Sequence, residues 1–95
     1  MSDLLDIKGR TVLVTGAGQG VGRQVALYLA EHGAGAVVVN DFHAERAESV
    51  AAEVDAAGAK ALPLAFDVSD FDAVGAAFAK TQEAFGALDI LVNNA

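Results

Sequence analysis

The feature that most constrains this chain of 95 residues is a regular alternation of short β-branched apolar runs with longer stretches of helical periodicity. The runs at 11–15 and 36–40 are continuously apolar, which is typical of strands buried on both faces. Residues 60–66 and 88–92 predict a third and a fourth strand, and Pro63 suits the third strand to a sheet edge.

Three amphipathic stretches separate these strands. The first helix is predicted from about Val21 to Gly33, the second over 44–57, and the third begins at a cap provided by Ser69 or Asp70 and ends at Gly86. The side chains expected to face the sheet are Val21, Val25 and Leu29 in the first helix, Ala47, Val50, Ala51 and Val54 in the second, and Val74, Ala77, Phe78 and Phe85 in the third.

The resulting order, β-α-β-α-β-α-β, predicts an α/β fold. Crossovers between parallel strands are right-handed in nearly all proteins, so the chain should form a partial, Rossmann-type, doubly wound parallel sheet with strand order 3-2-1-4. The length suffices for one small domain, and no linker or internal repeat divides residues 1–95.

Composition narrows the class of protein. Hydrophobic residues make up 54% of the chain, which argues against disorder, and the net charge of −7 argues against nucleic acid or an anionic membrane as a partner. There is no cysteine, no cluster with metal-ligand spacing, no signal peptide and no apolar stretch of membrane-spanning length. We therefore expect a cytoplasmic protein without a metal site.

A glycine-rich segment, Thr15-Gly16-Ala17-Gly18-Gln19-Gly20-Val21-Gly22, joins the first strand to the first helix. A helix amino terminus offers free N–H groups and partial positive charge, and glycine lets a pyrophosphate approach the backbone closely. The strict G-x-G-x-x-G pattern is absent, because its last position falls on Val21, Arg23 or Val25. The alternative is a turn that only reverses the chain; the strand before it and the helix after it favour a phosphate site.

The pattern that does fit is Thr-Gly-x-x-x-Gly-x-Gly, which resembles the short-chain dehydrogenase/reductase family. Asp41 ends the second strand, Asp67-Val68 ends the third, and Asn93-Asn94-Ala95 comes after the fourth, as in that family. The resemblance covers residues 8–95. The extended, epimerase-like branch carries a glycine where this chain has Gln19, so that branch is disfavoured.

This resemblance implies a nicotinamide dinucleotide site. Asp41 lies 19 positions after Gly22, close to the offset of a ribose-binding acid, and its charge would repel the 2′-phosphate of NADP. NAD is therefore favoured over NADP, although Arg46 lies near enough to reach a phosphate. The resemblance implies that Asp67 and Val68 border the adenine. The implied cofactor-binding residues are Gly16, Gln19, Gly20, Val21, Gly22, Asp41, Asp67, Val68 and Asn94.

Several of these residues have a structural alternative. Asp41 can cap the helix that comes after it and Asp67 can begin a turn, in each case alongside the binding role. Asn93 is more readily explained as a tie between adjacent strands than as a ligand contact. Arg23 is expected in solvent, and His32 and His43 are expected as exposed residues at helix ends.

The resemblance also implies an activity, the interconversion of a carbonyl and an alcohol by hydride transfer. In the family the acid–base residue is a tyrosine, which lies four residues before a lysine that lowers its pKa. A serine and a further asparagine complete that site, and all four residues come after the Asn-Asn-Ala segment in the chain. Here the only tyrosine is Tyr28, and His32 stands four positions after it. No catalytic residue is therefore assigned, and we expect an inactive, cofactor-binding portion of a larger enzyme similar to alcohol dehydrogenases or 3-oxoacyl reductases, homo-oligomeric when intact.

Two other functions remain open from the sequence. One is a stand-alone nucleotide-binding half-domain without catalysis, which would differ from the enzyme only in the residues beyond Ala95. The other is a methyltransferase of similar fold, which Thr15 before the glycines and the terminal Asn-Asn-Ala disfavour.

Overall fold

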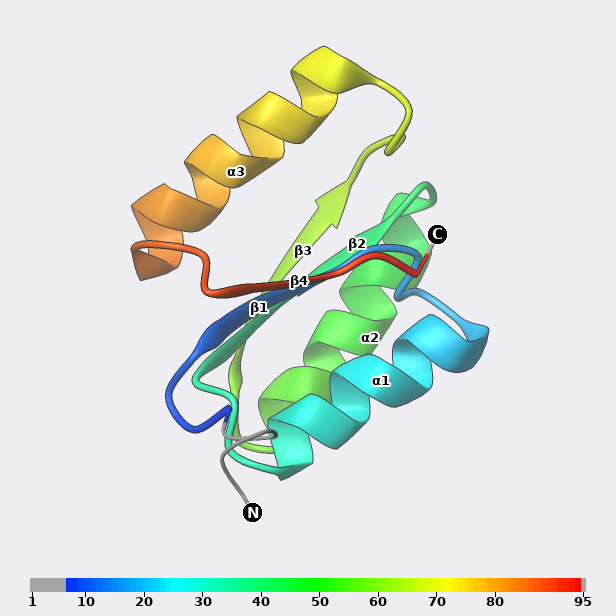
Figure 1. Ribbon diagram of the computed structural model, residues 1–95. Coiled ribbons are helices and arrows are strands. Elements are labelled where there is room, and N and C mark those ends of the chain that lie inside the picture. Colours follow the sequence, from blue (N-terminus) through cyan, green and yellow to red (C-terminus); the bar gives the residue numbers. More distant parts are fainter. Residues whose placement is uncertain (1–6, 95) are drawn as a thin grey trace.

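The computed structural model describes residues 7–94 and consists of one four-stranded parallel sheet with helices on both faces (Figure 1). The strands are β1 (Thr11–Val14), β2 (Ala36–Asp41), β3 (Lys60–Ala65) and β4 (Ile90–Val92), and the helices are α1 (Gly20–Glu31), α2 (Ala44–Ala56) and α3 (Phe71–Phe85). The strand order is β3-β2-β1-β4, so the predicted topology is confirmed.

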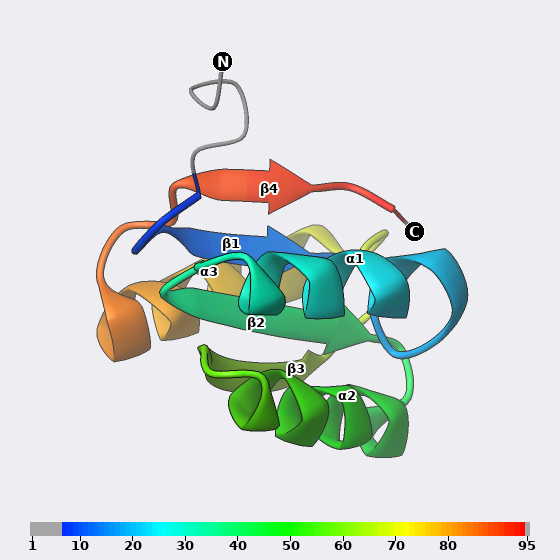
Figure 2. The ribbon, with the colours of Figure 1, turned by 90° about the horizontal axis from the view of Figure 1, so that it is seen from below.

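The two faces of the sheet are covered differently. Figure 2 shows α1 and α2 side by side over one face and α3 alone behind the other. The core lies under α1 and α2, where inward-facing valines of the two central strands meet small helix residues. Its members include Val12, Val14, Val37, Val39, Ala26, Ala30, Ala47, Val50, Ala51 and Val54.

The face of α1 that touches the sheet differs from the predicted one. Val25 and Leu29 are half-buried against the core, but Val21 is 70% exposed, and the fully buried positions are Gly22, Ala26 and Ala30. The reason is close approach: a helix that lies tight against a sheet presents its smallest side chains to it. The expected contact of Val21 with the sheet is therefore wrong.

Helix α3 begins as predicted and packs less than predicted. Asp70 is its cap, accepting a hydrogen bond from the Ala73 N–H at 3.2 Å. Ala77 is buried, but Phe78 is 43% exposed, and Val74 and Phe85 are only half-buried. Within residues 7–94 no second helix lies on this face, so nothing covers the flanks of α3.

The two edge strands also differ from each other. Pro63 lies in β3 at one edge, as predicted, opposite Val39 of β2. At the other edge β4 is shorter than the predicted 88–92, because the Asp89 carboxylate accepts the Thr11 N–H at 2.9 Å and replaces a backbone partner there.

Among the described helices none is both long enough and apolar enough to cross a bilayer.

Candidate functional site

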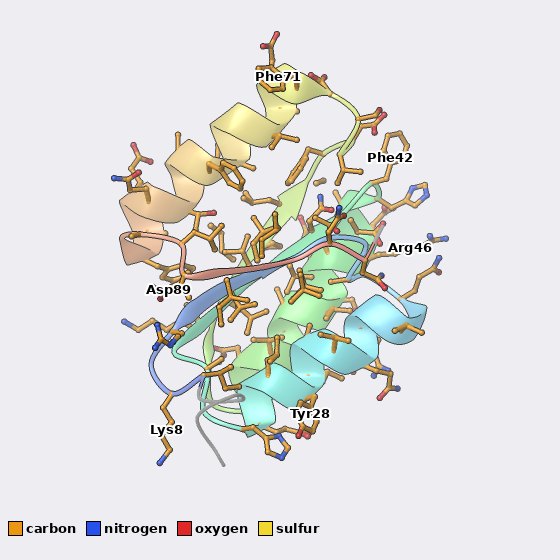
Figure 3. All side chains as sticks on the ribbon, viewed as in Figure 1. Lys8, Tyr28, Phe42, Arg46, Phe71 and Asp89 are labelled. Atoms are coloured by element: carbon orange, nitrogen blue, oxygen red, sulfur yellow. The ribbon has the colours of Figure 1, made fainter. Side chains whose placement is uncertain are left out.

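A groove of about 510 Å³ opens at the carboxyl ends of the strands, where all the loops after β1, β2, β3 and β4 meet. Ligands of open α/β sheets bind at this edge. Figure 3 shows Phe42 and Arg46 at this end of the molecule and Lys8, Tyr28 and Asp89 at the other. The groove is lined by Gly16, Gln19, Gly20, Asn40, Asp41, Phe42, His43, Arg46, Phe66, Asp67, Val68 and Asn94.

Seven of the nine predicted site residues lie in this groove. They are Gly16, Gln19, Gly20, Asp41, Asp67, Val68 and Asn94. Val21 instead points away, into a separate shallow groove along the outer side of α1 beside Tyr28. Gly22 is not among the residues that line the groove.

The glycine loop is folded in a way that larger residues would prevent. Gly16 and Gly20 have φ angles of +62° and +59°, in the left-handed region that glycine adopts without strain. A Cβ on Gly22 would lie 2.2 Å from the Gly16 carbonyl oxygen, so α1 can start this close to β1 only with glycine there. The loop thereby directs the amino end of α1, with its unpaired N–H groups, to the groove.

Asp41 is the buried acid of the site. Asp41 is only 6% exposed. Each of its carboxylate oxygens accepts one backbone hydrogen bond, Oδ2 from the Gly18 N–H at 3.1 Å and Oδ1 from the His43 N–H at 2.9 Å. Asp41 does not cap α2, because the cap residue of that helix is His43; the bond from the His43 N–H instead holds the turn before the helix. Since each carboxylate oxygen has two lone pairs, both oxygens keep capacity to accept a ligand hydroxyl.

Gly18 is a residue that the sequence interpretation left out of the site. A Cβ there would lie 2.4 Å from Asp41 Oδ2 and 2.6 Å from the Arg46 Cβ. The loop and the acid are therefore in direct contact, and only glycine allows it. The signal was present in the sequence as a third glycine between Gly16 and Gly20.

Asp67 lies on the opposite wall, after β3. Its Oδ1 accepts hydrogen bonds from the Ser69 N–H at 2.9 Å and the Ser69 hydroxyl at 2.7 Å. The backbone bond, and then the hydroxyl bond, hold the pKa of the Asp67 carboxyl below its usual range. Asp67 thus forms the predicted turn and is ionised at neutral pH.

The segment after β4 is tied to the glycine loop. The Asn94 N–H donates to the Thr15 hydroxyl at 2.8 Å, and Asn94 Nδ2 donates to the Gly16 carbonyl at 3.2 Å. The Thr15 hydroxyl in turn donates to Asn93 Oδ1 at 3.2 Å. The interpretation of Asn93 as a tie between β4 and β1 is confirmed, and Asn94 joins the loop to the groove wall.

Asn40 is the second residue that the sequence interpretation missed. It is 1% exposed, and its amide hydrogen-bonds the glycine loop on one side and β3 on the other. A polar residue in an otherwise apolar strand, directly before the acid, was the available signal. The four lining residues Phe42, His43, Arg46 and Phe66 were likewise not assigned to the site.

Charge in and near the groove is mixed. Arg46 is the only arginine or lysine among the lining residues, against the carboxylates of Asp41 and Asp67. Arg23 remains partly in solvent, as expected, and also forms a bidentate ion pair with Glu53 that joins α1 to α2. Residues 7–94 contain no group of three or more histidine, aspartate or glutamate side chains that could hold a metal ion.

Comparison with known proteins agrees with this geometry. The family described as short chain dehydrogenase matches residues 10–95. Over 91 residues the chain is 43% identical to the (2S)-[(R)-hydroxy(phenyl)methyl]succinyl-CoA dehydrogenase subunit BbsD of Thauera aromatica, covering 96% of this chain and 36% of that protein. It is 42% identical over 86 residues to the 3-oxoacyl-[acyl-carrier-protein] reductase FabG of Staphylococcus aureus, covering 90% and 35%.

Solved structures share the fold. A hydroxysteroid dehydrogenase from Escherichia coli superposes with a TM-score of 0.91 at 36% identity, covering 100% of this chain and 40% of that one. A 7α-hydroxysteroid dehydrogenase complexed with NADH and 7-oxo glycochenodeoxycholic acid gives 0.90 at 35%, covering 99% and 36%. A dehydrogenase from Burkholderia cenocepacia with bound NADP gives 0.85 at 36%, covering 92% and 34%.

The chain spans 34% to 40% of the length of these five proteins. Within that span the strand order and the fold agree with those structures. The chain belongs to the short-chain dehydrogenase/reductase family.

Proposed function

We propose that this chain binds the adenosine and pyrophosphate part of a nicotinamide dinucleotide, with NAD preferred over NADP, in an oxidoreductase that interconverts a carbonyl and an alcohol. The observation that carries the proposal is the Asp41 carboxylate, buried at the groove floor in contact with the glycine loop. A carboxylate placed there can accept hydrogen bonds from both hydroxyls of a ribose.

The residues present fit this ligand. The amino end of α1 suits a pyrophosphate, because the first turn of a helix combines free N–H groups with partial positive charge. The wall formed by Phe66, Asp67 and Val68 offers one apolar surface and one hydrogen-bond acceptor to an adenine. Asn94, which lines the same groove and donates a hydrogen bond to the Gly16 carbonyl, would contact a ribose of the dinucleotide. The nicotinamide ring, when bound, supplies or accepts the hydride.

The preference for NAD follows from charge. A 2′-phosphate would replace one ribose hydroxyl and meet the Asp41 carboxylate at hydrogen-bond distance, where two negative charges repel strongly in a partly buried site. Arg46 acts in the opposite direction, since its guanidinium lines the same groove. Relatives with the same fold hold NADH or NADP, so the family alone does not decide between them.

The preference is tested by direct binding. Titrating NADH and NADPH into the purified chain, monitored by nicotinamide fluorescence or calorimetry, should show NADH binding at least about tenfold more tightly, or about 1.4 kcal/mol. Asp41→Ala should bring the affinities for NADH and NADPH closer together, because it removes both the acceptor for the ribose hydroxyls and the charge that repels the 2′-phosphate. Glu45→Ala, an acid in the first turn of α2 outside the groove lining, is the matched control. Equal or tighter binding of NADPH to the unmodified chain would refute the assignment.

We also expect this chain alone to bind without turnover. Hydride transfer to a carbonyl needs a proton donor beside the substrate oxygen, and a positioned acid–base group contributes about 10²–10⁴ in rate. The sequence contains no Tyr-x-x-x-Lys segment. NADH absorbance should stay constant with a panel of ketones; consumption that disappears in Gly20→Val would show a catalytic group that this interpretation lacks.

A further inference from the structure

The amide of Asn40 connects the two walls of the groove. On one side Oδ1 accepts the Gly16 N–H at 3.2 Å, and the Asn40 backbone carbonyl accepts the Ala17 N–H at 2.6 Å. On the other side Nδ2 donates to the carbonyls of Leu64 at 3.2 Å and Phe66 at 3.1 Å. One buried residue in β2 thereby holds the glycine loop and the end of β3.

The chemistry of these partners admits only one orientation of the amide. The loop side presents an N–H group and needs an acceptor, while the β3 side presents two carbonyl oxygens and needs two donors. Asparagine supplies one acceptor and two donors on a short side chain. Aspartate would offer an oxygen to the two carbonyls, and alanine would remove the acceptor and both donors from these part-buried backbone groups, which is unfavourable.

The location of Asn40 decides what the linkage does. The neighbouring core valines Val37 and Val39 face α1 and α2, so Asn40 lies on the opposite side of the pleat, with Val38. It therefore takes no part in the core under α1 and α2. It lines the groove between the loop expected to hold a pyrophosphate and the segment expected to hold an adenine.

We propose that Asn40 is a positioning residue that sets the separation between the phosphate side and the adenine side of the groove. The proposal rests on the proposed function, because it assigns to those two walls two parts of one ligand. A ligand that reaches both walls depends on their separation, since a small misplacement forfeits one set of contacts or the other. A ligand that touches only one wall does not.

The test compares adenosine, which needs only the adenine side, with ADP, which needs both. Asn40→Ala should weaken ADP binding at least about tenfold, or about 1.4 kcal/mol, and adenosine binding less than about threefold. Asn40→Ser, which keeps a hydroxyl and leaves less unpaired backbone, should show an intermediate effect and serves if the alanine variant does not fold. Val38→Ala, in the same strand and on the same side of the sheet, is the matched control for lost stability.

The result that overturns the proposal is an equal weakening of both ligands in the Asn40 variants, or the same selective loss of ADP in Val38→Ala. A second readout needs no ligand. Amide hydrogen exchange should speed up in Asn40→Ser at Gly16 and Ala17 of the loop, and at Phe66 after β3, relative to Ala77 in α3. If the unmodified chain binds neither adenosine nor ADP, the proposed function fails. Faster exchange confined to one wall would still refute the linkage.

Discussion

The two faces of the sheet use their apolar residues in opposite ways. Under α1 and α2 the residues are small, and valines and alanines such as Val54 and Ala26 are fully buried. On the α3 face the strand residues Leu13 and Val38 are buried, but the large side chains of α3 itself are less covered, with Phe78 partly in water and Phe71 almost entirely so. Figure 3 shows Phe71 pointing outward from the end of α3.

We therefore expect the contribution of a side chain to stability to depend on completeness of burial more than on its size. Apolar area removed from water stabilises by about 25 cal/mol per Å², so a small side chain enclosed on all sides can contribute more than a half-exposed ring. The well-packed face also carries the contact between Gly18 and Asp41, which forms one part of the groove. Two experiments compare the two faces and a third tests an ion pair on the face of α1 and α2, in order from the largest expected effect to the smallest.

The largest difference in stability between the two faces should come from adding one methyl group to a glycine on each of them. Gly22→Ala places a Cβ 2.2 Å from the Gly16 carbonyl oxygen, and the backbone shift needed to relieve this contact should cost about 3 kcal/mol or more and abolish ADP binding. Gly75→Ala, in the middle of α3 with open space around the new Cβ, should instead stabilise by about 0.5–1 kcal/mol. Urea unfolding and ADP titration measure both, and similar effects at the two sites would contradict the comparison.

A medium effect is expected from truncating one apolar side chain on each face. Val54→Ala removes two buried methyl groups from α2 and leaves a cavity, for a loss of about 2 kcal/mol. Phe78→Ala removes far more atoms, yet should cost only about 1 kcal/mol because so much of that ring is already in water. If chemical denaturation ranks the two variants the other way, α3 is packed more tightly than the exposure of Phe78 indicates.

The smallest effect should come from the ion pair between α1 and α2. The hydrogen bond from Arg23 is the main cause that lowers the pKa of Glu53 below its ordinary value of 4.5. A lowered carboxyl pKa stabilises the folded state above pH 4.5, and that contribution is lost as the pH falls through the lowered pKa. Both side chains are more than a third exposed, so solvent screening keeps the contribution small.

Arg23→Gln should therefore lower the melting temperature slightly at neutral pH and not at all once the pH lies below the folded pKa of Glu53. High salt should narrow the difference at neutral pH. Glu53→Gln should give the same loss, and the double variant no further loss, since one interaction is removed in each case. A pH-independent difference would show that Arg23 acts through packing of its methylene groups.

The sequence pattern was sufficient for the topology and for most of the groove. Strand order results from alternation of strands and helices together with right-handed crossovers, so it needed no knowledge of side-chain contacts. The strand order also predicts which residues line the groove, because the carboxyl ends of parallel strands share one edge of the sheet. Asp41, Asp67 and Asn94 lie at that edge with the glycine loop.

The predictions that failed depend on packing distance, which a pattern of apolar residues does not encode. The spacing of Val21, Val25 and Leu29 marks an apolar stripe on α1, but the contact face lies one residue further along, at Ala26 and Ala30, because small side chains allow a closer helix. Asn40 was missed for a related reason. Its role lies in partners 24 and 26 residues away, which no local pattern shows.

Pro63 makes the two edges of the sheet unequal as sites for pairing with a further strand. A strand arriving at the outer side of β3 would meet a residue with no N–H to donate, so hydrogen-bonded addition stops there. The opposite edge has no such block: β4 presents Ile90, Leu91 and Val92, with Leu91 half in water. Strand exchange between two copies of this chain, or templated addition during misfolding, should therefore start at β4 and yield pairs joined through that edge alone.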